Sequence, residues 1–181
     1  MNTEQLFSEI DRHFLAKLDY IQRFTSSERQ IEGWFKGELI YLFTSLQGKG
    51  ELEGWEPEVL VLRLGKKMVD FRVKLDNGFA WLELKSLYHG QQRGQPIDLG
   101  IYFYKDSVGI WGDVQKLASV VEGHGYCVMF IYPRPEVDRW QELLKKYRQR
   151  IGNYTFQEKS KVSQFPSDLY IAKIEIAQCS S

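Results

Sequence analysis

The chain has 181 residues, of which 43% are hydrophobic and 14% aromatic, and its 24 lysines and arginines balance 24 aspartates and glutamates. This composition is typical of a folded protein with a sizeable core and excludes a largely disordered chain. The absence of net charge counts against a strongly basic nucleic-acid-binding domain, although a local basic patch is compatible with it.

The first half of the chain predicts two helices and then three strands. Apolar residues recur at helical spacing over residues 3–24, and Ser27 has the form of a cap that opens a second helix to about Leu46. The three strands are expected over residues 58–64, 68–75 and 79–85, and the short turns between them predict an antiparallel meander. A polar, glycine-rich segment over residues 88–99 is expected to be a mobile loop.

The second half predicts two further helices that alternate with two strands. These elements are expected over residues 107 or 113 to 122 (helix), 125–132 (strand), 135–150 (helix) and 168–177 (strand). Together the elements predict an α/β sandwich with a mixed sheet, in a single domain over residues 1–181.

The hairpin between the second and third strands carries the most informative residues. Asn77-Gly78 predicts a type I′ turn, which places Arg72 opposite Glu83 and Asp70 opposite Lys85. Because side chains alternate along a strand, Asp70, Glu83 and Lys85 share one face, with the two acids as diagonal neighbours.

Two interpretations of this face stay open. Two carboxylates that lie close together can share a divalent cation beside an ammonium group, which outlines a site for metal-dependent hydrolysis. The same register also forms two cross-strand ion pairs on a solvated sheet face, each contributing a few tenths to about 1 kcal/mol. From the hairpin alone, this ladder of ion pairs is favoured.

The wider pattern resembles the PD-(D/E)XK nuclease superfamily. That family has a core of a helix, a three-strand meander, a helix and a strand, an order that residues 27–132 follow. An Asp on its second core strand and an acid-x-Lys triplet on its third match Asp70 and Glu83-Leu84-Lys85. Glu38 would be the glutamate that the family often places on the preceding helix, whereas Val69 stands where the motif has Pro. This agreement favours the family over the ladder.

The resemblance implies a restriction endonuclease-like three-layer sandwich and a nuclease that cleaves DNA with Mg²⁺ or Mn²⁺. Asp70 and Glu83 would hold the cation, with the Leu84 carbonyl as a further ligand. Lys85 would orient and help to deprotonate the attacking water, or stabilise the developing negative charge. Glu38 would be an outer ligand or would recruit a second metal.

Other residues near the motif are weaker candidates. Arg72 would contact phosphate or, as favoured here, pair with the glutamate opposite it. His89 and Arg93 follow the third strand in the polar segment and would reach a substrate. Asp113 and Lys116, on the next helix, are expected to be surface charges.

A catalytically inactive module that keeps the nuclease fold and binds nucleic acid or protein is the alternative function. DNA is the expected partner, and a homodimer is implied by the resemblance, because many relatives cut both strands as dimers. We expect no membrane partner and a cytoplasmic location, because no stretch is apolar enough to cross a bilayer and no signal peptide is evident.

Overall fold

The computed structural model describes residues 1–26, 31–61, 67–92, 95–103, 109–120, 122–150, 154–160 and 169–178. The helices are α1 (Thr3–Leu15), α2 (Leu18–Ser26), α3 (Glu32–Gly48), α4 (Ile110–Ala118), α5 (Val137–Arg150) and the 3-10 helix η2 (Leu99–Phe103). The strands are β1 (Gly54–Leu60), β2 (Met68–Leu75), β3 (Gly78–Tyr88), β4 (Gly90–Gln92), β5 (Gln95–Ile97), β6 (His124–Tyr132), β7 (Tyr154–Glu158) and β8 (Tyr170–Gln178). Within these ranges, no helix combines the length and the apolar character that a membrane crossing needs.

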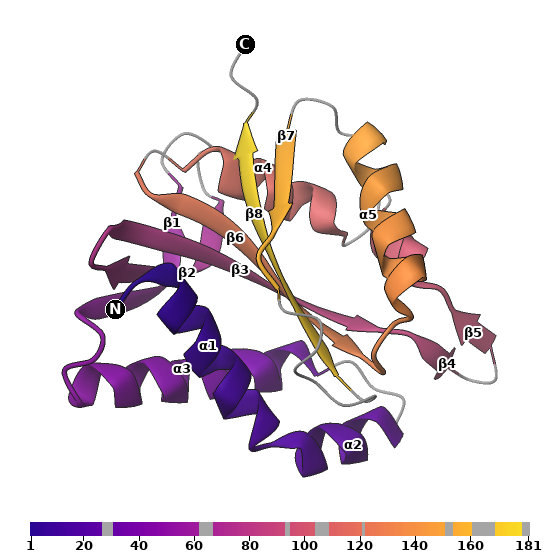
Figure 1. Cartoon of the computed structure of the whole chain (residues 1–181), viewed down its shortest axis with the longest axis horizontal. Coiled ribbons are helices and arrows are strands. Elements are labelled where there is room, and N and C mark those ends of the chain that lie inside the picture. The colour runs from indigo at the N-terminus through magenta and orange to yellow at the C-terminus, as the bar shows by residue number, and fades with distance from the viewer. Residues whose placement is uncertain are drawn as a thin grey trace.

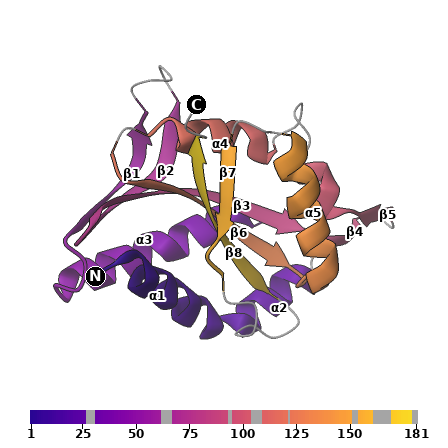
Figure 2. The same ribbon diagram turned by 45° about the horizontal axis from the view of Figure 1, so that its top comes forward.

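Helices cover both faces of a six-stranded mixed sheet, with α1 and α3 on one face and α4 and α5 on the other (Figure 1 and Figure 2). The strand order is β1-β2-β3-β6-β8-β7, and β4 pairs with β5 in a separate hairpin. β3 and β6 are parallel, whereas the other neighbouring pairs of the large sheet are antiparallel. The predicted α/β class, mixed sheet and antiparallel meander are therefore confirmed.

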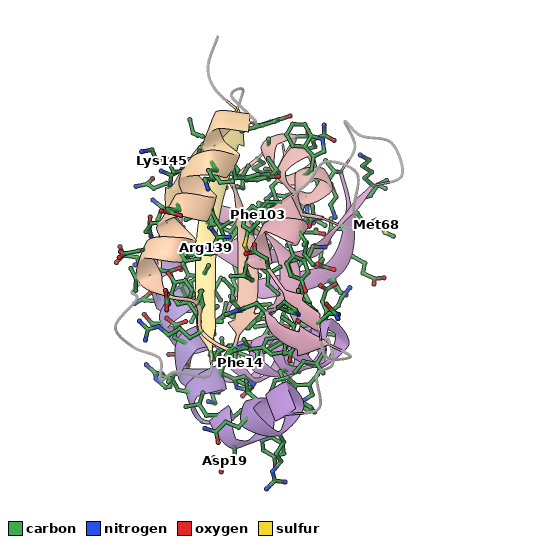
Figure 3. All side chains as sticks on the ribbon, turned by 90° about the vertical axis from the view of Figure 1, so that its right-hand side faces the viewer. Phe14, Asp19, Met68, Phe103, Arg139 and Lys145 are labelled. Atoms are coloured by element: carbon green, nitrogen blue, oxygen red, sulfur yellow. The ribbon has the colours of Figure 1, made fainter. Side chains whose placement is uncertain are left out.

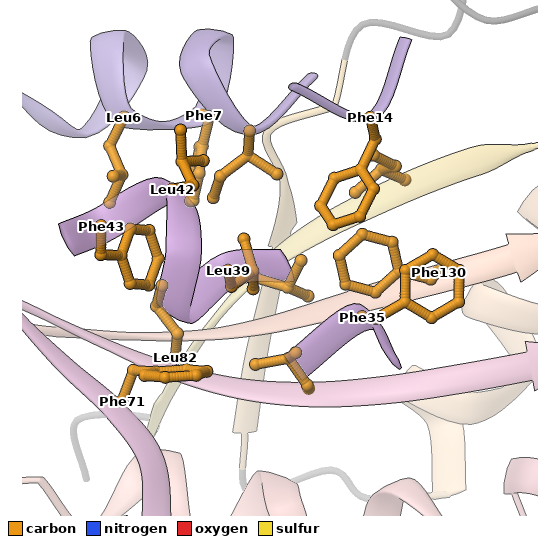
Figure 4. Packing of buried hydrophobic residues seen from close by; sticks show 14 of the residues in the cluster. Leu6, Phe7, Phe14, Phe35, Leu39, Leu42, Phe43, Phe71, Leu82 and Phe130 are labelled. Carbon is orange, nitrogen blue, oxygen red and sulfur yellow. The ribbon is translucent and has the colours of Figure 1, made fainter. Parts of the chain in front are cut away.

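The sheet separates two hydrophobic cores. On the α1–α3 face, the rings of Phe35 and Phe130 stack with their centroids 4.1 Å apart, and Phe14 meets Phe130 edge-on at 4.7 Å (Figure 4). On the α4–α5 face, Phe103 of η2 (labelled in Figure 3) packs against Tyr147 of α5, and their ring centroids are 4.9 Å apart. Because both faces are covered, polar side chains on the central strands are enclosed by helices.

Strand β2 changes the core against which it packs at Asp70. Phe71 belongs to the α1–α3 core, whereas Val69 belongs to the α4–α5 core. Side chains two residues apart normally share a face, so the regular alternation of side chains along β2 is interrupted at Asp70. On β1, the residue opposite Asp70 in the register is Glu58, and its φ of 51° is uncommon for a residue other than glycine.

The pairing of β2 with β3 is shifted by two residues from the predicted register. Leu75 lies opposite Gly78, and continuation of the ladder places Asp70 opposite Glu83. Gly78 has a φ of 114°, but Asn77 does not have a positive φ. The loop is therefore not the type I′ turn that Asn-Gly predicts, since that turn needs two successive residues with positive φ.

Several predicted boundaries are also corrected. The helix expected over residues 3–24 is divided into α1 and α2, because the chain turns at Ala16 and Lys17. The segment expected to be a loop over residues 88–99 contains the β4–β5 hairpin, and β7 was not predicted. The cap predicted at Ser27 lies outside the described residues.

A buried ion pair joins α1 to β8. The ammonium group of Lys173 contacts the carboxylate of Asp11, and both side chains are buried. Burial lowers the pKa of Lys173, although the negative charge of Asp11 opposes this shift. The two charges therefore depend on each other, since either one alone would be buried without a partner.

We expect Asp11→Ala to lower the free energy of unfolding by about 3–5 kcal/mol, because it leaves the Lys173 ammonium without its counter-charge. The double variant Asp11→Leu/Lys173→Met should lose much less, because it removes both charges together. Urea denaturation followed by circular dichroism measures both values. Equal losses in the single and double variants would show that packing, and not charge, is the main contribution of this pair.

Candidate active site

The two acids of the motif lie where β2 and β3 stop pairing. The last backbone pair is Phe71 with Leu82. Beyond it, Asp70 Oδ2 accepts a hydrogen bond from the backbone N–H of Leu84 at 2.9 Å, and Glu83 Oε2 accepts one from the N–H of Asp70 at 3.3 Å. Both carboxylates are thereby held at the point where the strands separate.

A lysine of α3 contacts the acids on the β1 side of this point. Lys36 Nζ lies 2.9 Å from Asp70 Oδ1 and 3.0 Å from Glu58 Oε1. Although burial opposes the shift, these two carboxylates raise the pKa of Lys36. In the strand register, Glu58, Asp70 and Glu83 follow one another across β1, β2 and β3, so the site contains a row of three acids.

Helix α4 contributes two charged residues on the other side. Lys116 Nζ contacts the Glu83 carboxylate and lies 3.2 Å from Asp113 Oδ1, while Lys85 Nζ lies 3.2 Å from Asp113 Oδ2. Glu83 and Asp113 are each only 6% exposed. The expectation that Asp113 and Lys116 are surface charges is therefore wrong, because α4 covers the part of β3 that carries the motif.

The helix glutamate that reaches this region is Glu32, which the sequence reasoning missed. Glu32 Oε2 accepts a hydrogen bond from the backbone N–H of Ser86 on β3 at 3.0 Å. Glu38 instead lies 2.8 Å from His13 Nε2 and 2.9 Å from Lys17 Nζ, measured from its Oε2. The placement predicted for Glu38 is thus corrected: its contacts are with α1 and the turn after it, and not with Asp70 or Glu83.

The charges in the cluster shift one another's protonation. Burial, and then the negative charges of Asp70 and Asp113, raise the pKa of Glu83 to about 8, although Lys116 opposes this shift. Burial opposes ionisation of Lys85, but the charge of Asp113 raises its pKa above the ordinary value. At neutral pH, Lys85 is therefore an ammonium ion, whereas Glu83 is mostly protonated.

Acids outnumber amines in this cluster, which we call the carboxylate–lysine cluster. Its members are Glu32, Glu58, Asp70, Glu83, Asp113, Lys36, Lys85 and Lys116. Five carboxylates and three ammonium groups give a net charge of −2 when all are ionised. Among the described residues, no group of three or more His, Cys, Asp or Glu side chains is arranged to hold a metal ion. In this arrangement Lys36 and Lys116 each bridge two carboxylates.

The ion pairs predicted from the hairpin do not form. Arg72 lies opposite Trp81, and its guanidinium contacts Glu56 at 2.6 Å and lies 5.4 Å from the Trp81 ring centroid. The predicted Arg72–Glu83 and Asp70–Lys85 contacts are replaced by contacts with β1, α3 and α4. The solvated ladder is therefore excluded as an account of this face.

The remaining candidates lie apart from the cluster or outside the described residues. His89 follows β3 and lines a separate cavity of about 250 Å³ with Asp98 and Arg139. Arg93 is outside the described residues. The backbone N–H of Leu84 donates a hydrogen bond to Asp70, so this residue lies directly beside one of the two acids.

Comparison with known proteins finds no match to this chain among protein-family models, curated proteins or solved structures. The carboxylate–lysine cluster, with its geometry and charge, is therefore the feature of this chain that indicates a function.

We expect Glu83 to make the protein less stable as the pH rises through neutrality. Its pKa of about 8 in the folded state lies above the ordinary value of 4.5, so the folded state binds this proton more tightly than the unfolded state. That stabilisation is complete below the unfolded pKa and is lost as the pH rises through the folded pKa. In metal-free buffer, the free energy of unfolding should be more than about 1 kcal/mol lower at about pH 8.5 than at about pH 5.5.

Urea denaturation at both pH values measures this difference. Glu83→Gln should reduce this difference in the free energy of unfolding, because the amide does not titrate. A pH dependence that Glu83→Gln leaves unchanged would assign the effect to another group.

Proposed function

We propose that this protein is a metal-dependent nuclease of the PD-(D/E)XK type, with a restriction endonuclease-like fold, that hydrolyses phosphodiester bonds in DNA. The observation that carries this proposal is the facing pair of Asp70 and Glu83 where β2 and β3 separate, with Lys85 two residues farther along β3. The order α3, β1, β2, β3, α4, β6 gives further support, because it is the helix, meander, helix and strand order of that superfamily.

The donor atoms of the cluster suit Mg²⁺ or Mn²⁺, which prefer hard oxygen ligands. Asp70, Glu83 and the Leu84 carbonyl would hold the ion, whose positive charge would offset the excess of acids and favour ionised Glu83. When bound, such an ion polarises a phosphoryl oxygen and lowers the pKa of a bound water. Lys36 and Lys116 must then release their carboxylates, because ammonium and cation would compete for the same oxygens.

Lys85 would serve as a fixed positive charge. Its raised pKa keeps the ammonium protonated at neutral pH, so it has no free lone pair with which to deprotonate the attacking water. A charge held 3.2 Å from Asp113 is suited to stabilise negative charge that develops on the phosphate. Of the roles predicted from the sequence, charge stabilisation is therefore favoured over proton removal.

The lysine contacts favour one alternative function. Asp70 and Glu83 already have ammonium partners, Lys36 and Lys116. If a cation did not displace them, the protein would be an inactive module that keeps the nuclease fold and binds nucleic acid or protein. Whether the protein is a nuclease or an inactive module, the homodimer stays a prediction from the resemblance to the PD-(D/E)XK superfamily.

We expect Asp70→Asn and Lys85→Met each to reduce cleavage of labelled DNA by at least about 100-fold, because the first removes a negative ligand of the cation and the second removes the positive charge that would stabilise the phosphate. Calorimetric titration with Mg²⁺ should show weaker binding for Asp70→Asn but not for Lys85→Met. Glu38→Gln is the matched control, since it neutralises an acid of α3 outside the cluster and should retain wild-type cleavage.

The assay uses duplex and single-stranded DNA with the same protein samples. Cleavage that persists in both Asp70→Asn and Lys85→Met would contradict the site. Mg²⁺ binding by the wild type with no cleavage of either DNA would favour the inactive module instead.

A further inference from the structure

The ammonium group of Lys36 lies at a point where oxygens of two acids converge. Its nitrogen, Nζ, is 2.9 Å from Asp70 Oδ1 and 3.0 Å from Glu58 Oε1. The other oxygen of Asp70, Oδ2, is fixed by the backbone N–H of Leu84 at 2.9 Å. A positive charge thus already lies between two carboxylate oxygens, which are the hard ligands that a divalent cation such as Mg²⁺ prefers.

The backbone of β1 brings Glu58 to this point. Trp55 packs against the α1–α3 core and Val59 against the α4–α5 core, although residues four apart on a strand normally share a face. Between them, Glu58 has a φ of 51°. This conformation is costly for residues other than glycine, and such residues cluster at functional sites. The structure therefore keeps a glutamate, opposite Asp70, at a backbone position that suits glycine.

The contacts of Lys36 are more accessible to a cation from water than those of Lys116. The side chains of Lys36 and Glu58 are 27% and 62% exposed. By contrast, Lys116 is 16% exposed, and each of its two carboxylate partners is 8% exposed. A displaced Lys36 ammonium can turn to solvent, so it does not become a buried charge without a partner. Replacement of Lys36 by a cation therefore costs less than replacement of Lys116.

We propose that the divalent cation takes the position of the Lys36 ammonium group, between Asp70 and Glu58, and that Glu58 is a further ligand of the cation. This inference rests on the proposed function. It extends the ligand set that the sequence predicts, which contains Asp70, Glu83 and the Leu84 carbonyl. Lys36 is then an internal competitor that balances the charge of the acids until a cation binds. The motif does not predict these roles, because neither residue belongs to it.

Calorimetric titration with Mg²⁺ tests both roles. Lys36→Met removes the competitor, so we expect it to bind Mg²⁺ about ten-fold more tightly than the wild type. Glu58→Gln removes a charged ligand and should bind Mg²⁺ at least about ten-fold more weakly. Glu58→Asp keeps the charge but withdraws the carboxylate, and it should also weaken binding, by about five-fold. Wild-type affinity in Glu58→Asp would show that this residue acts only through its charge, and would overturn the inference.

Two variants are matched controls for charge in general. Glu56→Gln changes an acid two residues before Glu58 on β1, which is 56% exposed and is paired with an arginine of β2. Lys17→Met changes a lysine that is 26% exposed and lies 2.9 Å from a carboxylate oxygen of α3, almost as Lys36 lies from its own partner. Both controls should retain the wild-type affinity for Mg²⁺. Changes in the controls as large as those in the test variants would overturn the inference.

Thermal melting in metal-free buffer verifies that each variant is folded. Glu58→Gly is a second test variant at this position, because glycine adopts a positive φ without strain and should keep the backbone of β1 as it is. It should lose at least as much affinity for Mg²⁺ as Glu58→Gln. A folded Glu58→Gly variant that binds Mg²⁺ like the wild type would refute the role of Glu58.

Cleavage of DNA by the same samples separates this inference from the proposed function. Mg²⁺-dependent cleavage by the wild type, with normal Mg²⁺ affinity in all the Glu58 variants, would leave the nuclease proposal intact and refute Glu58 as a ligand. Mg²⁺ affinities that follow the expected order, with no cleavage of duplex or single-stranded DNA, would support the position of the cation and refute the nuclease proposal.

Discussion

Backbone pairing between β2 and β3 ends where β2 changes the core against which it packs, and the geometry of the site depends on this constraint. Buried N–H groups need acceptors, and beyond this point the carboxylates of Glu83 and Asp70 accept from the N–H groups of Asp70 and Leu84. The two acids therefore have a structural role in closing the hairpin. Their positions are set by the backbone itself, before any cation or substrate is present.

Enclosure of these acids determines which other residues must be present. Two carboxylates this close repel each other, and burial strengthens that repulsion, so cations have to lie nearby. Lys36 comes from α3 on one face of the sheet and Lys116 from α4 on the other. The carboxylate–lysine cluster thus connects the two helical layers through residues of β2 and β3.

The sequence predicted that Glu83 and Lys85 share a face of β3, and the error in the predicted register did not change this. A register shift of two residues changes every partner but leaves each side chain on the same face, so Glu83 and Lys85 stayed together. It was harder to predict which side chains of α3 face the site, since apolar residues occur around much of the circumference of this helix. Glu32 and Lys36 are four residues apart and share a face, whereas Glu38 lies about 200° around the axis from Lys36. The signal for Asp113 was its place in the apolar stripe that includes Ile110 and Leu117.

The parallel pairing of β3 with β6 has a consequence for how the site is assembled. A parallel pair needs a long crossover, and here that crossover contains α4, with Asp113 and Lys116. The β2–β3 hairpin can form from local contacts, but alone it would bring two acids together without Lys116. Its acidic end therefore opposes its own closure until the crossover docks, and any fluctuation that detaches α4 should open the same end first.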